Sequence, residues 1–280
     1  MRLTQEQVSA MNLIQKDLLK SFIDVCMKLN LKYYMVHGSL LGTLKYGDFF
    51  PLDDDIDVAM PREDYNKLLE FGQSLLPDNV FLQSCKSEKE YPMVFAKLRD
   101  NNTAFIQTLM KGLNINQGIY IDIFPIDYYP KNRFKKIWLR FLDKLYLSRI
   151  GTRINYDSGE AKWKKIIRSI SCIFCPSWEK AVKKRAGLYA KFPQSDRVIV
   201  IGGKASEQGI PSAWFGNGEE LEFAGLSVRC PQMHKDYMTC IYGDYMNYNP
   251  SEKNINDDGT VTVSAEVFST TQSYLDFNGI

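Results

Sequence analysis

Carboxylates crowd one short stretch of the chain. "DDDIDVAM", residues 53–60, holds four aspartates in five positions and follows the glycine-rich "HGSLLGTLKYG". Side chains two residues apart in a strand point to the same face, so Asp55 and Asp57 share a face while Ile56 and Val58 point the other way. Two carboxylates on one face suit a hard divalent cation such as Mg²⁺, or Mn²⁺ in its place.

A third carboxylate of this kind lies in "YIDIFPID", residues 120–127. Asp122 alternates with Ile121 and Ile123, which places it on the strand face opposite its apolar neighbours. If the two strands pair, Asp122 meets the first two aspartates. The sequence therefore predicts one metal site with Asp55, Asp57 and Asp122 as ligands and catalytic residues.

A phosphate site is predicted just upstream, where Gly38 and Ser39 stand between an apolar run and a short helical pattern. Glycine lets the backbone approach a ligand closely, and free N–H groups at a helix start favour phosphate. A solvated acidic loop is the simpler interpretation of the aspartates, but it fits poorly with the apolar residues that flank Asp57 and Asp122. An EF-hand is excluded, because "DDDID" lacks its glycine and closing glutamate.

The surrounding pattern predicts a mixed α/β fold that begins with a helix, which Thr4 and Gln7 open as a capping box. Strands are expected at 31–37, 55–60, 80–84, 93–100, 118–124, 198–201 and 221–229. Helices are expected at 39–47, 62–76, 131–150, 161–171, 177–190 and near 233–243. Residues 1–250 are predicted to form one catalytic domain, and 251–280 a loose polar tail with one strand at "TVTVSAEVF".

Composition places the chain among globular proteins, with 280 residues, 45% hydrophobic and 24% charged. Six scattered cysteines, no signal peptide and no apolar run long enough to cross a bilayer indicate a cytoplasmic protein, at the inner face of the membrane if it meets lipid. The net charge is uneven. Residues 131–191 hold 17 Lys and Arg against 4 Asp and Glu, a net of +13, and since the whole chain carries +2, the remainder carries −11.

Four separate segments resemble the LicD family, the cholinephosphotransferase-like proteins that also include the fukutin-related enzymes. They are "YMVHGSLLGTLKYGDFFPLDDDIDVAMPREDY" (34–65), "KLRDNNTAF" (97–105), "QGIYIDIFPID" (117–127) and "YGDYM" (242–246), in family order. One departure is Leu52 after Pro51, where the family pattern has tryptophan; no ligand is lost by it.

The resemblance implies a nucleotidyltransferase-like fold, a mixed sheet flanked by helices. The charge and the helical periodicity of residues 131–191 add a basic helical insertion to it. The resemblance also implies Mg²⁺-dependent transfer of a phospho-substituent, such as phosphocholine, from a CDP-linked donor to a hydroxyl of a cell-surface glycan or glycolipid (teichoic acid, lipopolysaccharide or capsule). Asp55 and Asp57 would hold Mg²⁺, Asp122 would complete the site or accept the hydroxyl proton, and Gly38 and Ser39 would touch donor phosphates.

Further substrate contacts are expected from Lys97 and Arg99, which share one face of a strand and either neutralise phosphate oxygens or form a solvated face. Tyr242 and Asp244 follow a late helix and are assigned to substrate binding. Asp53 and Asp54 are expected around the metal ligands, without binding the ion. His37 is expected to end a strand, with its ring satisfied by the backbone.

The basic segment places apolar residues along one helical stripe with Arg and Lys around it: Phe134, Ile137, Trp138, Phe141, Leu142 and Leu145. This pattern is typical of a helix on anionic lipid and also of a core helix with a solvated outer face, which we favour; a phosphate-rich polymer would equally explain the charge. No motif indicates nucleic-acid binding. Rival functions are a nucleotidyltransferase, a DxD glycosyltransferase and a non-catalytic phospho-glycan binding protein.

Overall fold

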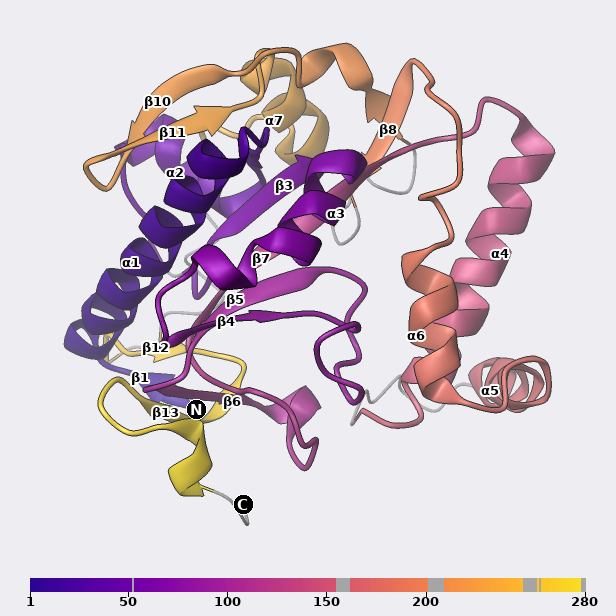
Figure 1. The fold of residues 1–280 in the computed structure, drawn as a ribbon, viewed down its shortest axis with the longest axis horizontal. Coiled ribbons are helices and arrows are strands. Elements are labelled where there is room, and N and C mark those ends of the chain that lie inside the picture. Colours follow the sequence, from indigo (N-terminus) through magenta and orange to yellow (C-terminus); the bar gives the residue numbers. More distant parts are fainter. Residues whose placement is uncertain (52, 155–161, 201–208, 249–255, 257, 278–280) are drawn as a thin grey trace.

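A mixed sheet lies at the centre of the computed structural model (Figure 1), which describes residues 1–51, 53–154, 162–200, 209–248, 256 and 258–277. Within these residues the sheet has seven strands, in the order β2-β3-β7-β5-β4, with β8 paired to β7 and β9 to β8. The strands are β2 (Tyr34–Met35), β3 (Asp57–Pro61), β4 (Val80–Gln83), β5 (Ala96–Asp100), β7 (Tyr120–Tyr128), β8 (Arg197–Val200) and β9 (Ile210–Pro211).

Strand β7 organises the sheet. Along one side it pairs with β3 in parallel, and along the other it pairs antiparallel with β5 over its first half and with β8 over its second. The pairing of β3 with β7 is the one that the convergence of the predicted metal ligands requires. The expected mixed α/β architecture is confirmed.

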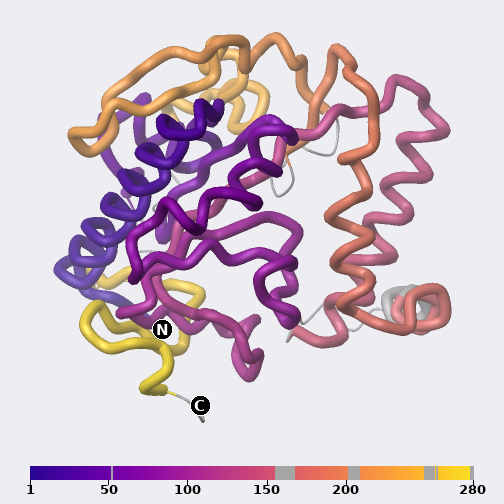
Figure 2. Tube along the Cα trace, in the orientation of Figure 1, coloured from indigo at the N-terminus to yellow at the C-terminus, as the bar shows by residue number. Residues whose placement is uncertain are grey.

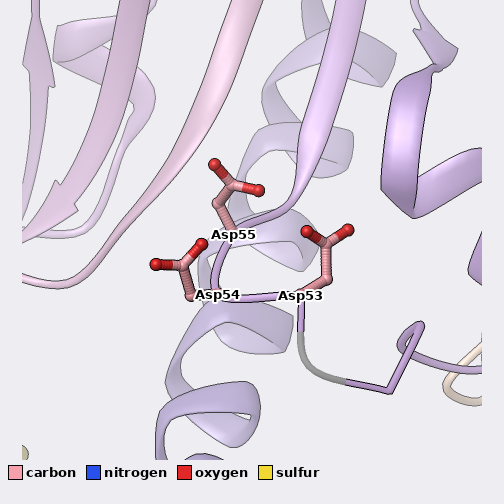
Figure 3. Close-up of side chains that lie close together, drawn as sticks. All are labelled: Asp53, Asp54 and Asp55. Atoms are coloured by element: carbon pink, nitrogen blue, oxygen red, sulfur yellow. The ribbon is translucent and has the colours of Figure 1, made fainter. Parts of the chain in front are cut away.

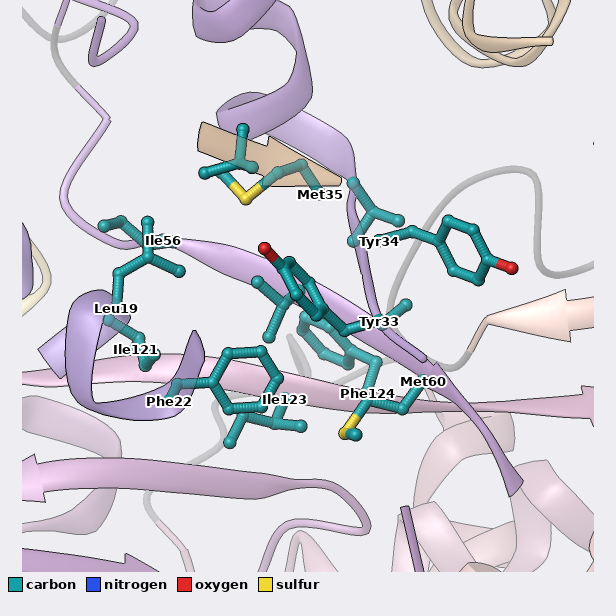
Figure 4. Close-up of a cluster of buried hydrophobic side chains, with 14 of the residues drawn as sticks. Leu19, Phe22, Tyr33, Tyr34, Met35, Ile56, Met60, Ile121, Ile123 and Phe124 are labelled. Carbon is teal, nitrogen blue, oxygen red and sulfur yellow. The ribbon is translucent and has the colours of Figure 1, made fainter. Parts of the chain in front are cut away.

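Helices α1 (Gln5–Leu29) and α3 (Arg62–Phe71) contact each other and the sheet. The predicted capping box at Thr4 and Gln7 is present, and Asn30 ends α1 in the left-handed conformation. Figure 4 shows Leu19 and Phe22 of α1 among Ile56, Ile121 and Ile123 of the sheet region. These isoleucines are fully buried, so the apolar alternation around Asp122 is directed into the core.

Helix α2 (His37–Tyr46) contacts β3, helix α7 (His234–Tyr242) and the hairpin of β10 (Glu219–Phe223) and β11 (Leu226–Cys230). The single strand expected over 221–229 is therefore two strands. Ala224 and Gly225 turn the chain between them, both at positive φ. Short 3-10 helices occupy Gln73–Leu75, Thr108–Met110, Ser212–Trp214 and Tyr274–Phe277.

The basic insertion is helical as expected and lies at one side of the sheet (Figure 1), as α4 (Arg133–Ile150), α5 (Lys162–Phe174) and α6 (Trp178–Ala186). Helix α4 packs on both of the others. The interpretation of its stripe as a core face is wrong for four residues. Phe134, Ile137, Trp138 and Phe141 are exposed, whereas Leu142 is half-buried and Leu145 is buried.

The C-terminal segment is not loose where the structure describes it. Strand β12 (Val261–Thr262) pairs with β1 (Arg2–Leu3), and β13 (Ala265–Ser269) pairs with β6 (Ala104–Gln107), which brings both chain ends to one edge of the molecule (Figure 2). Val261, Val263 and Ala265 are buried because they alternate inward along the segment. None of the described helices combines the length and the apolar content that a bilayer crossing needs.

Candidate active site

A row of polar side chains crosses four neighbouring strands. Asp57 is the register partner of Asp122, Asp122 of Lys97, and Lys97 of Gln83. Directly paired residues on adjacent strands present their side chains on the same face of a sheet. Two carboxylates, an ammonium and an amide therefore stand side by side, and each is at most 9% exposed. This burial rules out the solvated acidic loop for Asp57 and Asp122.

Asp55 joins this row from the loop before β3. The strand begins at Asp57, two residues later than the sequence predicts, so Asp55 is outside the regular ladder. One carboxylate oxygen from each of Asp55, Asp57 and Asp122 nevertheless lies within 4.8 Å of the other two. The three carboxylates predicted to form one metal site therefore lie together in the structure. Asp55 comes from the loop, Asp57 from β3 and Asp122 from β7.

Asp53 and Asp54 extend the acidic cluster along the loop before β3. Together with Asp55 they form a second set whose carboxylate oxygens lie within 4.8 Å of one another (Figure 3), and all three are half-buried. Ser264, in the C-terminal segment, lies close enough to Asp54 to oppose the rise in the pKa of Asp54 that burial causes. Ser264 is therefore a site residue that the sequence analysis did not identify, since no local pattern connects it with residue 54.

The first turn of α2 is fixed to β3 through Asp57. The Asp57 amide donates to the Ser39 hydroxyl at 2.8 Å, and the Val36 amide donates to the Asp57 carbonyl at 3.1 Å. Gly38 faces Asp53 so closely that an added Cβ would lie 1.9 Å from Oδ2 of that carboxyl. A larger residue at position 38 would therefore displace the Asp53 side chain, and the neighbour of Gly38 at the helix start is a carboxyl group.

Crowding of like charges sets the electrostatics of the cluster. Burial, and then the neighbouring Asp57, raises the pKa of Asp55 well above its usual value, and burial followed by Asp122 does the same for the pKa of Asp57. Burial and Asp54 raise the pKa of Asp53 to about 7. These carboxyl groups therefore hold protons that ordinary aspartates lose.

Lys97 supplies positive charge at the inner end of the cluster. Its Nζ forms an ion pair with Oδ1 of Asp122 and lies 3.3 Å from the centroid of the Tyr120 ring. Burial raises the pKa of Asp122, and Lys97 opposes that shift. Lys97 is 2% exposed, so the expectation of a solvated strand face is wrong for it.

Arg99 lies one row further along the same face, opposite Tyr120, and is fully buried. Its Nε donates to Gln83 Oε1 and its Nη1 to the Gly118 carbonyl, both at 2.6 Å. Gln83 in turn donates to Glu88 at 2.6 Å. Arg99 thus belongs to a buried network behind Lys97, and the solvated-face alternative is wrong for it too. Gln83 and Tyr120 were missed, although both follow the two-residue period of the predicted site residues.

The remaining candidates lie on α2 and at the end of α7. Burial, then Asp53 and Asp57, raises the pKa of Tyr242, so this phenol is close to the acidic cluster. Asp244 is exposed and accepts a hydrogen bond from Asn247 at 2.8 Å, and no described contact joins it to the cluster. His37 begins α2 at φ 50°, and its Nε2 has no hydrogen-bond partner among the described residues. Burial lowers the pKa of His37 to about 4, which keeps the ring neutral.

The acidic cluster fits a divalent cation. Five carboxyl groups converge here. Among the ion pairs of the described residues, a single one reaches this cluster, from Lys97 to Asp122. The three-residue set offers oxygen ligands alone, which suit Mg²⁺ or Mn²⁺ better than softer metals. Burial first, and the neighbouring carboxyl groups second, raise the pKa values of these aspartates, and a bound cation would favour their charged forms.

Comparison with known proteins agrees with this geometry. Residues 30–149 match the LicD/FKTN/FKRP nucleotidyltransferase domain profile. The chain carries a LicD-family nucleotidyltransferase domain. It is also similar to a curated relative named lipopolysaccharide cholinephosphotransferase LicD, from Haemophilus influenzae, at 25% identity over 255 residues, which cover 86% of this chain and 91% of the relative.

The LicD-family match covers the turn at Gly38, the three convergent aspartates and Lys97. It ends before α5 and α6 of the basic insertion, and before Tyr242 and Ser264. The similarity to the Haemophilus protein extends over most of the chain, and the family resemblance noted from four sequence segments is confirmed. The chain is thus a distant homologue of that relative, and its residues 30–149 are similar to a LicD/FKTN/FKRP nucleotidyltransferase domain.

Proposed function

We propose that this protein transfers a phospho-substituent, phosphocholine or a related phospho-alcohol, from a CDP-linked donor to a hydroxyl of a cell-surface glycan. The observation that carries the proposal is the convergence of Asp55, Asp57 and Asp122 beside the first turn of α2. The relative's name supports a cholinephosphotransferase-like reaction, and its acceptor, lipopolysaccharide, supports a glycan or glycolipid acceptor. Teichoic acid and capsule are acceptors of the same chemical class.

Asp55, Asp57 and Asp122 would hold Mg²⁺, with Mn²⁺ as a substitute. When bound, the ion would neutralise charge on the donor diphosphate and on the departing CMP. In the reaction the acceptor oxygen bonds to the phosphorus that carries the alcohol, the bridging P–O bond to CMP breaks, and the hydroxyl proton passes to a carboxylate. Asp122 is our candidate for that carboxylate, because its ion pair with Lys97 holds it in a fixed orientation.

The roles of the other residues follow from their positions. Gly38 and Ser39 would present the start of α2 to a donor phosphate, beside the Asp53 carboxyl. Lys97 would offset phosphate charge from the inner wall, and Arg99 would act indirectly by supporting Lys97 through Tyr120. Tyr242 would contact the donor near Asp53, whereas Asp244 would meet the substrate only at the exposed rim.

The decisive experiment incubates the purified protein with Mg²⁺, a panel of CDP-alcohols and candidate glycans, and measures CMP release and the mass gained by the glycan. We expect release of CMP together with the mass of one phospho-alcohol. Asp57→Asn should abolish both, and Asp78→Asn, at an exposed residue before β4, is the matched control and should retain most of the activity. Normal turnover by Asp57→Asn would refute the proposal.

The same assay separates the rival functions. A nucleotidyltransferase would transfer the CMP moiety to the acceptor, a DxD glycosyltransferase would consume a sugar nucleotide, and a binding protein would retain the glycan without turnover.

We place the reaction in the cytoplasm, with the six free thiols in support, because reduced cysteines are usual in that compartment.

A further inference from the structure

The first half of α4 carries a stripe of exposed apolar side chains. Phe134 is 81% exposed, Ile137 55%, Trp138 59% and Phe141 50%. Their spacing of three and four residues puts them on one helical face, and the Trp138 and Phe141 rings stack with centroids 5.5 Å apart. A contiguous exposed patch of large apolar side chains marks a binding surface far more often than isolated ones do.

This stripe is not the face by which α4 joins the protein. Leu139 and Ile150, on the other side of the helix, are buried, and the face of the stripe is covered only further along, where Leu142 is half-buried and Leu145 is buried. Leu139 packs with Tyr129, Tyr189 and Ile199, while Ile150 belongs to a separate cluster beneath the insertion. The helix is thus already anchored, and its four outward side chains contribute to none of the described core clusters.

A second exposed apolar stripe ends α5. Ile170 is 37% exposed, Ile173 77% and Phe174 70%, again at helical spacing. Ser171 and Cys175 are the buried residues beside them. Two helices that pack on each other therefore each leave an apolar face without cover among the described residues.

Positive charge surrounds these stripes. The insertion from residue 131 to 191 has a net charge of +13, against −11 for the rest of the chain. Arg133, Lys135 and Lys144 are exposed on α4 next to the stripe. The insertion thus combines apolar side chains of interfacial type with a strong attraction for an anionic surface.

We propose that the outward faces of α4 and of the end of α5 dock this protein onto an anionic lipid bilayer. Trp138, Phe134 and Phe141 enter the boundary between headgroups and acyl chains, and the flanking Arg and Lys bind lipid phosphates. A hydrated polyanion would use the charge but would leave the aromatic stripe in water. A second copy docked face to face would bring two insertions of +13 together.

The test is co-sedimentation of the purified full chain with vesicles of phosphatidylcholine mixed with phosphatidylglycerol, compared with phosphatidylcholine alone. We expect binding to the mixed vesicles, weakening as salt is added. Trp138→Glu, and separately Lys135→Glu, should each lower the partition coefficient by about tenfold or more, because each loses an attraction and adds a repulsion. Neither donor nor metal is needed, so this test is independent of the proposed activity.

Matched controls carry the same substitutions elsewhere. Phe71→Glu alters an aromatic side chain that is 49% exposed at the end of α3, and Lys28→Glu reverses an exposed charge on α1. Both should bind as the wild type does, as should Asp57→Asn. The proposal is overturned if mixed vesicles do not bind, if the controls lose as much as the α4 variants, or if Trp138→Glu binds normally while Lys135→Glu does not. The last result would assign the charge to an anionic polymer.

Discussion

Lys97 and Asp122 face each other across neighbouring strands, and the ammonium offsets one of the negative charges that five aspartates bring together. Both side chains are almost fully buried, so neither can exchange its partner for water. The pair therefore fixes the orientation of Asp122 at the inner end of the acidic cluster. Asp122 thus stands in a fixed place beside Asp55 and Asp57 in the candidate cation site.

Breaking this pair from one side should be costly. Lys97→Met leaves a buried carboxylate without its partner, and we expect it to lower the free energy of unfolding by about 3–5 kcal/mol. Denaturant titration measures the loss. The double variant Lys97→Met/Asp122→Asn should be more stable than Lys97→Met alone, because the uncompensated charge is gone. Simple additivity of the two single costs would contradict the coupling.

Proton and metal should compete for the acidic cluster. The folded-state pKa values of Asp53, Asp55 and Asp57 are raised, so folded protein binds more protons than unfolded protein above pH 4. In chelator, the contribution of these groups to stability should therefore fall as pH rises, for Asp53 toward its pKa of about 7.

Added Mg²⁺ should reverse this trend, because it binds the deprotonated groups. We expect the increase in Tm caused by Mg²⁺ to be larger at pH 8 than at pH 5, measured by thermal unfolding with chelator as the reference. Asp57→Asn should lose most of the increase, whereas Asp244→Asn should keep it. Equal increases at both pH values would argue against a carboxylate cation site.

Individual site residues were predictable where local alternation reveals them. Asp57 and Asp122 stand between apolar residues that point into the core, so their shared face could be derived from the sequence. The pairing of Lys97 with Asp122 could not, because it depends on the register of β5 against β7. Ser264 was beyond reach for the same reason, since its contact with Asp54 spans most of the chain.

At the scale of elements, β7 and α3 are joined by one ion pair. Arg62, the first residue of α3, donates from Nε to Asp127 Oδ1 at 2.6 Å and from Nη2 to Oδ2 at 2.5 Å. The side chain of Asp127 is 1% exposed. This bidentate contact holds the start of α3 on the strand that also carries Asp122.

Arg62→Leu should therefore destabilise the fold by about 3 kcal/mol or more, since it leaves the Asp127 carboxylate buried and unpaired. Arg2→Leu is the matched control, because it removes one partner of the exposed pair with Asp258, and it should change the free energy of unfolding by less than about 1 kcal/mol. Urea unfolding compares the two. Equal effects would mean that the α3 contact adds nothing beyond a surface pair.

Element types were largely predictable, and the errors have physical causes. Periodicity located the helices of the insertion, but an amphipathic helix reads the same whether its apolar face meets a core or remains outside, so the exposure of Trp138 was not foreseen. The strand expected over 221–229 is split by the turn at Ala224 and Gly225, and Gly225 was the turn signal that the expected strand ran through. Strand β3 starts late because Asp55 belongs to the loop.

At the scale of the whole molecule, the two ends of the chain build one edge together. The Met1 ammonium donates to the Ala265 carbonyl at 2.8 Å, and β1 and β6 each take a C-terminal strand as partner. The prediction of a loose tail was wrong because it relied on composition, in which polar residues outnumber apolar ones. The alternation in "TVTVSAEVF" was the better signal.

A charge placed in this edge should show how much it contributes. Val261 is 2% exposed in a cluster with Leu3, Met11 and Phe105, and Val261→Asp should lower the free energy of unfolding by about 3 kcal/mol. Thr262→Asp, exposed on the same strand, should have little effect. Thermal unfolding of both variants tests this, and comparable losses would contradict the inward packing of the segment.

The contact of Ser264 with Asp54 has a consequence for biosynthesis. A nascent chain can form β3 and β7 long before the ribosome reaches residue 264, yet its acidic loop then lacks Ser264 as a neighbour. Strands β1 and β6 likewise have no strand partner until β12 and β13 have been synthesised. The acidic loop can therefore reach its finished arrangement only after residue 264 has left the ribosome, and translation itself sets the earliest moment at which it can form.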